Sequence, residues 1–170
     1  MYRNSQAEIL RPVSPLLVLM TVILALLLNS LPWEGIWLDL RPDFVALVLL
    51  YWSLYHPNRL GIGLAWVVGM LADVVDASLF GQHALAYTVL AFGGAVLHRR
   101  LQMFELREQT AQVFGILVLT YGVYALVHWQ VNGYVAWTYF LGCLTSALIW
   151  IPLGSLLGAM GRRRAERRFS

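Results

Sequence analysis

The sequence predicts an all-α membrane protein with six transmembrane helices, and three observations lead to this prediction. Hydrophobic residues make up 59% of the 170-residue chain and charged residues only 12%, about half the charged share of a typical soluble domain. The apolar residues gather in runs that approach the roughly 20 residues needed to cross a bilayer as a helix. Short polar segments separate these runs, which span residues 15–31, 42–55, 60–77, 84–97, 113–129 and 134–160. We therefore expect one six-helix domain over residues 1–170.

The first two runs differ in length and in how they begin. The first, 15–31, has a signal-like charge pattern, but no small-x-small cleavage motif precedes Trp33, so we expect a retained anchor. The second begins with Pro42, which suits the first helical position, and Asp43 follows in the first turn, where the helix dipole favours an anion. This run extends only about 20 Å, short of the roughly 30 Å hydrocarbon core. Either the residues just before it dip into the membrane or the bilayer is locally thinned.

The third and fourth runs are joined by a turn at Gly81, and the third carries two carboxylates near its end. Asp73 and Asp76 lie one turn apart on nearly the same face of the expected helix. Each would cost roughly 2.5–3.5 kcal/mol at the middle of a bilayer. The sequence therefore requires a compensating partner for them.

The rest of the chain contains the longest polar connection and the two remaining crossings. Residues 98–112 alternate charged and apolar side chains, which suggests an amphipathic helix lying on the membrane surface. The sixth run, 134–160, contains Pro152, so we expect a break or a kink there.

The arginines predict the orientation. The chain has twelve arginines and no lysine, and eleven of them fall in segments that six crossings place on one side. By the positive-inside rule, both termini are then cytoplasmic. The excess of arginine is therefore explained by membrane orientation and not by nucleic-acid binding. Basic residues near the surface also attract anionic lipid. The arginines expected to contact lipid or cytosolic partners are Arg99, Arg100, Arg107, Arg162, Arg163 and Arg164.

The opposite side holds a candidate site. Arg41, Pro42 and Asp43 open the second crossing from that side, at about the depth that Asp73 and Asp76 reach from the other. One interpretation is an ion, proton or substrate site. The other is structural: a buried Arg41–aspartate pair together with capping of helix ends. We expect Asp43 and Asp73 to fix the geometry between the second and third crossings, with Arg41 as their partner.

Small residues recur at spacings that allow helices to approach closely. They form one series in the third crossing and another near the end of the sixth, and such series serve either internal packing or a partner's transmembrane helix. The residues are Gly61, Ala65, Gly69, Gly154 and Gly158.

Motifs of catalysis and metal binding are missing from the sequence. It has no GxSxG, phosphate loop or HExxH pattern, and its single Cys143 lies inside an apolar run. We therefore expect no enzyme, no metal and no cofactor.

Several motifs together resemble the MreD family of rod-shape-determining inner-membrane proteins. They are Arg41-Pro42-Asp43 opening an apolar helix, Gly69-x-x-x-Asp73, and Gly81-x-x-Ala84-Leu85, and the resemblance is strongest over residues 32–97. Asp76 departs from it. The resemblance implies a six-helix fold similar to the substrate-binding subunits of energy-coupling-factor transporters. It also implies a multi-pass protein of the bacterial inner membrane that acts in cell-wall elongation.

Two functions follow as expectations. The first is a non-catalytic scaffold or regulator of peptidoglycan elongation that maintains rod shape. The resemblance implies that its partners are an MreC-like bitopic protein, an MreB-like actin homologue, a RodA-like glycosyltransferase and a class B penicillin-binding protein. The alternative is the substrate-binding membrane subunit of a transporter for a small molecule or a lipid, in which the carboxylates line a cavity.

Overall fold

A computed structural model describes residues 14–57, 59–76, 78–133 and 139–166 of the chain. Within these ranges the regular structure is entirely helical, so the all-α prediction is confirmed. One short helix, α3 (Ile36–Asp39), interrupts the first long connection. The long helices are α2 (Pro15–Asn29), α4 (Phe44–Tyr55), α5 (Ile62–Val75), α6 (Gln82–Leu101), α7 (Leu106–Asn132) and α8 (Tyr139–Glu166).

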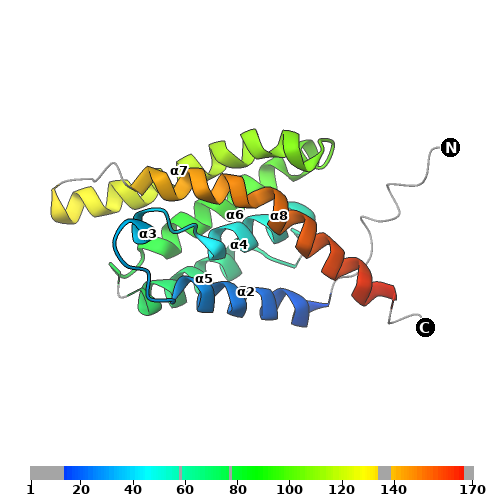
Figure 1. Ribbon diagram of the computed structural model, residues 1–170, viewed down its shortest axis with the longest axis horizontal. Helices are drawn as coiled ribbons and strands as arrows, with labels where there is room; N and C mark the ends of the chain where they lie inside the picture. Colours follow the sequence, from blue (N-terminus) through cyan, green and yellow to red (C-terminus); the bar gives the residue numbers. More distant parts are fainter. Residues whose placement is uncertain (1–13, 58, 77, 134–138, 167–170) are drawn as a thin grey trace.

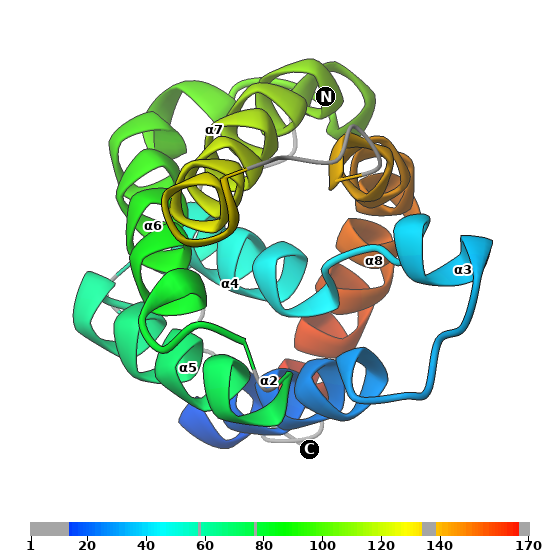
Figure 2. The same ribbon diagram turned by 90° about the vertical axis from the view of Figure 1, so that its left-hand side faces the viewer.

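Helix α4 is the centre of the bundle. Every residue from 45 to 54 is buried, as expected for a helix that is apolar on all sides. Figure 2 shows α4 in the middle, with α2, α5, α6, α7 and α8 arranged around it. The indole Nε1 of Trp52 donates to Thr21 Oγ1 at 3.0 Å, which ties α4 to α2. The helix that the other long helices surround is thus one of the shortest.

Helix α6 packs closely on two neighbours because glycines lie at the crossings. A Cβ built on Gly69 of α5 would lie 2.6 Å from the backbone nitrogen of Ala84, and one built on Gly94 would lie 2.9 Å from Ser53 Cβ of α4. Real Cβ atoms do not approach other atoms so closely. Glycine at these positions therefore sets the α5–α6 and α4–α6 distances.

The connection between α6 and α7 is much shorter than the sequence suggested. Helix α6 continues to Leu101 and α7 begins at Leu106, so the expected surface helix over 98–112 is wrong. Glu105 and Glu108 form a capping box at the start of α7. Gln109 Nε2 donates to the carbonyls of Leu101 and Phe104 at 2.9 Å each. The polar residues of this segment therefore cap and extend two long helices.

Two other expectations also need correction. Helix α4 begins at Phe44, so Pro42 lies outside it and Asp43 is its N-cap. Of the break or kink expected at Pro152, the break is wrong, because α8 is continuous from Tyr139 to Glu166. Figure 1 shows α8 changing direction part-way along its length.

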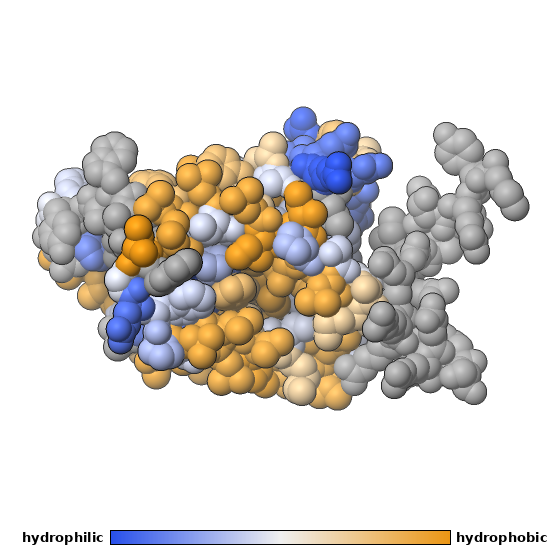
Figure 3. All heavy atoms as spheres, in the orientation of Figure 1, coloured by the Kyte–Doolittle hydropathy of each residue, from blue (hydrophilic) through white to orange (hydrophobic). Residues whose placement is uncertain are grey.

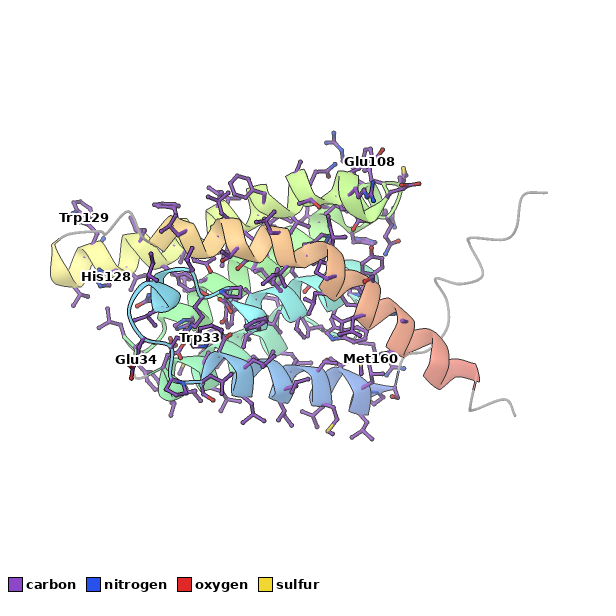
Figure 4. The ribbon with its side chains drawn as sticks, in the orientation of Figure 1. Trp33, Glu34, Glu108, His128, Trp129 and Met160 are labelled. Atoms are coloured by element: carbon purple, nitrogen blue, oxygen red, sulfur yellow. The ribbon has the colours of Figure 1, made fainter. Side chains whose placement is uncertain are left out.

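The two ends of the bundle carry different side chains. Figure 4 shows Trp33, Glu34, His128 and Trp129 at one end, and Glu108 and Met160 toward the other. We call the first the tryptophan end. The second is the arginine end, defined by the exposed Arg99, Arg100 and Arg107 beside Glu108. Helix α2 begins and α8 ends at the arginine end (Figure 1).

The flank of the bundle between these ends is apolar. Figure 3 shows hydrophobic side chains over the flank, with hydrophilic ones gathered toward the ends. Among the described residues, two segments, Arg107–Val131 and Phe140–Met160, are long and apolar enough to cross a membrane. Helices α2, α4 and α5 are apolar but shorter.

Candidate functional site

Asp43 lies at a meeting point of five helices at the tryptophan end. Its side chain caps α4 by accepting from the backbone N–H of Ala46 at 2.9 Å. It also accepts hydrogen bonds from the hydroxyl of Tyr87 on α6 at 3.0 and 3.1 Å and from that of Tyr124 on α7 at 2.9 Å. The Asp43 backbone N–H donates to Ser146 Oγ of α8 at 3.0 Å. One buried carboxylate thus holds α4, α6 and α7 together, and its backbone adds α8.

Asn29 brings α2 into the same network. As the last residue of α2, it donates from Nδ2 to Asp43 Oδ1 at 3.1 Å and accepts at Oδ1 from the backbone N–H of Phe44 at 3.1 Å. Its side chain therefore satisfies one acceptor and one donor at the start of α4. We refer to Asn29, Asp43, Tyr87, Tyr124 and Ser146 as the Asp43 cluster.

Asp73 is held in a different way, by the turn that follows its own helix. Asp73 is 1% exposed and accepts from the backbone N–H groups of Gly81 and His83, both at 2.8 Å. The hydroxyl of Ser78 donates to it at 3.1 Å, and His83 Nδ1 lies 2.9 Å from Asp73 Oδ1. Gly81 has φ +97°, a left-handed conformation that glycine adopts without strain. Asp73 therefore shapes the α5–α6 turn.

Arg41 and His83 connect the two carboxylate environments. The Arg41 guanidinium forms an ion pair with Asp76 at 3.1 Å and donates to the carbonyl of Asn29 at 2.8 Å. His83 Nε2 lies 3.7 Å from Asp76, and the His83 ring contacts the Tyr124 ring at a centroid distance of 4.9 Å. The turn after α5 is thereby attached to the segment between α2 and α4.

The structure thus brings together the predicted residues Arg41, Pro42, Asp43, Asp73 and Asp76 but pairs them differently from the expectation. The ion pair of Arg41 is with Asp76, whereas Asp43 and Asp73 have partners of other kinds. The physical reason is that tyrosine hydroxyls and helix-terminal N–H groups satisfy a buried carboxylate without a second charge. No distinct sequence signal marks Asn29, Tyr87 or Tyr124 as partners of Asp43. A polar or phenolic group within an apolar run was the one available hint.

The predicted small-residue positions do not share one surface. Ala65 and Gly69 are buried, with Gly69 against α6, whereas Gly61 is the exposed N-cap of α5. On α8, Gly154 is buried and Gly158 is half-buried. Gly69 therefore serves contact with α6 inside the bundle.

The predicted basic residues are described only in part. Arg99, Arg100 and Arg107 are exposed at the arginine end. The side chains of Arg162, Arg163 and Arg164 lie outside the described residues.

The carboxylates of both clusters have hydrogen-bond partners within the chain. Within the described ranges, no group of three histidine, cysteine or carboxylate side chains is arranged to hold a metal ion. The arrangement contains one arginine–aspartate pair, Arg41 with Asp76, and helix capping by Asp43.

Comparison with known proteins identifies the family. The model of the rod shape-determining protein MreD family matches residues 11–160. The chain belongs to the MreD family. It is 29% identical over 153 residues to the rod shape-determining protein MreD of Haemophilus influenzae, an alignment that covers 88% of this chain and 92% of that protein. MreD is a component of the rod-shape system and not a known enzyme family. No solved structure matches the chain.

Proposed function

We propose that this chain is a non-catalytic scaffold or regulator of peptidoglycan elongation in the bacterial inner membrane. The observation that carries the proposal is that the buried carboxylates of this MreD-family chain already accept hydrogen bonds from within the chain. Asp43 and Asp73 each accept several hydrogen bonds from within the chain. They stabilise a rigid bundle whose function is then to hold other membrane proteins.

The proposed topology has six crossings, by α2, α4, α5, α6, α7 and α8, with the arginine end in the cytoplasm. The exposed Arg99, Arg100 and Arg107 support this orientation, because arginines are enriched on the cytoplasmic side. Trp33 and Trp129 at the opposite end suit a membrane interface. Helix α4 is enclosed by the other long helices, so its short length does not require the bilayer to thin around it.

The proposed partners are an MreC-like bitopic protein, an MreB-like filament protein, a RodA-like glycosyltransferase and a class B penicillin-binding protein. Gly69 is occupied by α6, so a partner's transmembrane helix would have to use another surface. We propose the outward face of α5, where Leu64, Val67 and Leu71 lie on one side of the helix and are each about half exposed.

The test is to identify what co-purifies with the tagged chain from mild detergent. We expect an MreC-like protein and wall synthases, and we expect Leu71→Ala to reduce their recovery. Met20→Ala, at an equally exposed position on α2, serves as the matched control. Recovery of an ATPase module, or of a stoichiometric small molecule without any wall protein, would refute the scaffold.

The transport alternative is less well supported by the geometry. A binding subunit needs a cavity with polar groups left open to its substrate. Asp73 is instead 1% exposed and fully engaged with its own turn. One cavity among the described residues lies on the flank between α6 and α7, and neither carboxylate lines it.

A further inference from the structure

A hollow lies on the flank of the bundle between α6 and α7, and neither carboxylate cluster contributes to it. Its volume is about 400 Å³, and we call it the α6–α7 groove. It is lined by Val89, Gly93, Leu97 and Arg100 from α6 and by Gln112, Gly115, Ile116 and Leu119 from α7.

Two glycines keep the groove open. A Cβ on Gly115 would meet nothing within 4 Å, and one on Gly93 would meet only Ile116, at 3.6 Å. The next residue, Gly94, is the opposite case, because it packs tightly against α4. Gly94 therefore faces the core, whereas Gly93 and Gly115 widen a surface that faces away from it.

The groove is apolar along its length and polar at one end. Val89, Leu97 and Leu119 line its walls, whereas Arg100 lies near the end of α6, at the arginine end of the bundle. From Arg100 to Val89 the distance along α6 is about 16 Å at 1.5 Å per residue. This length is close to half of the roughly 30 Å hydrocarbon core. The groove therefore matches one leaflet, with a cation at headgroup level.

Gln112 adds an unsatisfied acceptor near the same end. Its Oε1 is buried and has no hydrogen-bond partner within the described residues. A buried carbonyl oxygen without a donor costs free energy, so an occupant that brings a hydroxyl group would be favoured.

We propose that the α6–α7 groove binds one phosphatidylglycerol molecule of the cytoplasmic leaflet. One acyl chain lies along Gly93 and Gly115, the phosphate accepts from Arg100, and a headgroup hydroxyl donates to Gln112 Oε1. Phosphatidylglycerol supplies all three features: an acyl chain, a net negative charge and hydroxyl donors. The leaflet assignment rests on the proposed orientation, whereas the groove and its charge do not.

The test is native mass spectrometry of the full-length purified protein with phosphatidylglycerol or phosphatidylethanolamine of identical acyl chains. We expect one phosphatidylglycerol to be retained preferentially. Arg100→Gln should weaken its binding about fivefold, as expected for one arginine near a charged headgroup, whereas Arg99→Gln, beside it but outside the groove, should not. Gly115→Leu should reduce retention to the level of phosphatidylethanolamine, because the new side chain fills the groove.

Gly122→Leu is the matched control for Gly115→Leu. It lies on the same helix, its Cβ also meets nothing within 4 Å, and it does not line the groove. Thermal unfolding of each variant verifies that the bundle is intact.

Equal retention of the two lipids, or equal loss of phosphatidylglycerol from Gly122→Leu, would overturn the proposal. So would full retention of phosphatidylglycerol by Gly115→Leu. If this variant also recovers less wall protein in the separate co-purification experiment, the groove receives a helix instead. The binding assay contains no partner protein, so it can fail while the scaffold proposal stands.

Discussion

Asp43 and Asp73 are both buried carboxylates at the tryptophan end, but their partners come from different distances along the chain. Tyr87 and Tyr124, which donate to Asp43, are 44 and 81 residues away in the sequence. The donors to Asp73 all lie within ten residues of it. The contacts of Asp43 therefore form only when the bundle assembles, whereas those of Asp73 need only one turn to form. The two residues separate global from local stability in one small membrane protein.

The largest effect is expected from Asp43→Leu. This change removes the acceptor of two tyrosine hydroxyls, the Asn29 amide and the Ala46 N–H. Each unsatisfied buried group costs about 1–3 kcal/mol, so we expect loss of at least about 3 kcal/mol and separation of α4 from α6 and α7. Urea or heat unfolding in detergent measures it. Asp43→Asn keeps an acceptor at this position and should retain more stability. If both variants unfold like the wild type, Asp43 does not hold the bundle together.

Asp73→Leu should have a smaller and more local effect, of about 1–3 kcal/mol. It frees the N–H groups of Gly81 and His83 but leaves the Asp43 cluster intact. Hydrogen exchange is the appropriate measurement. We expect faster exchange over 78–83 with unchanged protection in α4. Loss of protection throughout α4 and α8 would show that the turn is coupled to the core.

Gly69→Ala tests whether the α5–α6 contact depends on close approach. The new Cβ would lie 2.6–2.7 Å from backbone atoms of Ala84 and His83, so the helices must move apart, at a cost of about 1–3 kcal/mol. Gly63→Ala on the same helix is the control, because its Cβ meets nothing within 4 Å and alanine favours a helix by roughly 0.5–1 kcal/mol. The two variants should shift the unfolding midpoint in opposite directions. Equal shifts would mean that Gly69 is not a packing position.

The sequence was sufficient to predict that the described chain is all-helical and that Arg41, Asp43, Asp73 and Asp76 lie near one another. Runs of apolar residues mark the helices because this signal depends on composition alone. It does not require knowledge of which residues contact one another. The boundaries at 98–112 were missed because Arg99, Arg100 and Glu108 look like loop residues. They lie on helices that continue beyond the apolar flank, where charged side chains are favourable.

The pairing within the candidate site could not be predicted in the same way. Tyr87 and Tyr124 occur in apolar runs, where an inward-facing tyrosine and a lipid-facing one have the same sequence context. The rotation of each helix about its own axis decides whether a tyrosine faces inward or faces lipid, and packing between helices sets that rotation. Asp73 was more predictable in principle, because a carboxylate a few residues before a glycine turn has local N–H donors available.

The smallest expected effect is the coupling between Arg41 and Asp76, which joins the two carboxylate environments. Their side chains are 22% and 15% exposed, and ion pairs with access to solvent contribute about 0–1 kcal/mol. A double-mutant cycle of Arg41→Gln and Asp76→Asn measures the coupling free energy. Arg41→Gln alone should cost more than Asp76→Asn, because Arg41 also donates to the carbonyl of Asn29. If the coupling free energy instead exceeds the effect of Asp73→Leu, the Arg41–Asp76 pair fixes the end of α5 and the local turn does not. The contrast between Asp43 and Asp73 would then not hold.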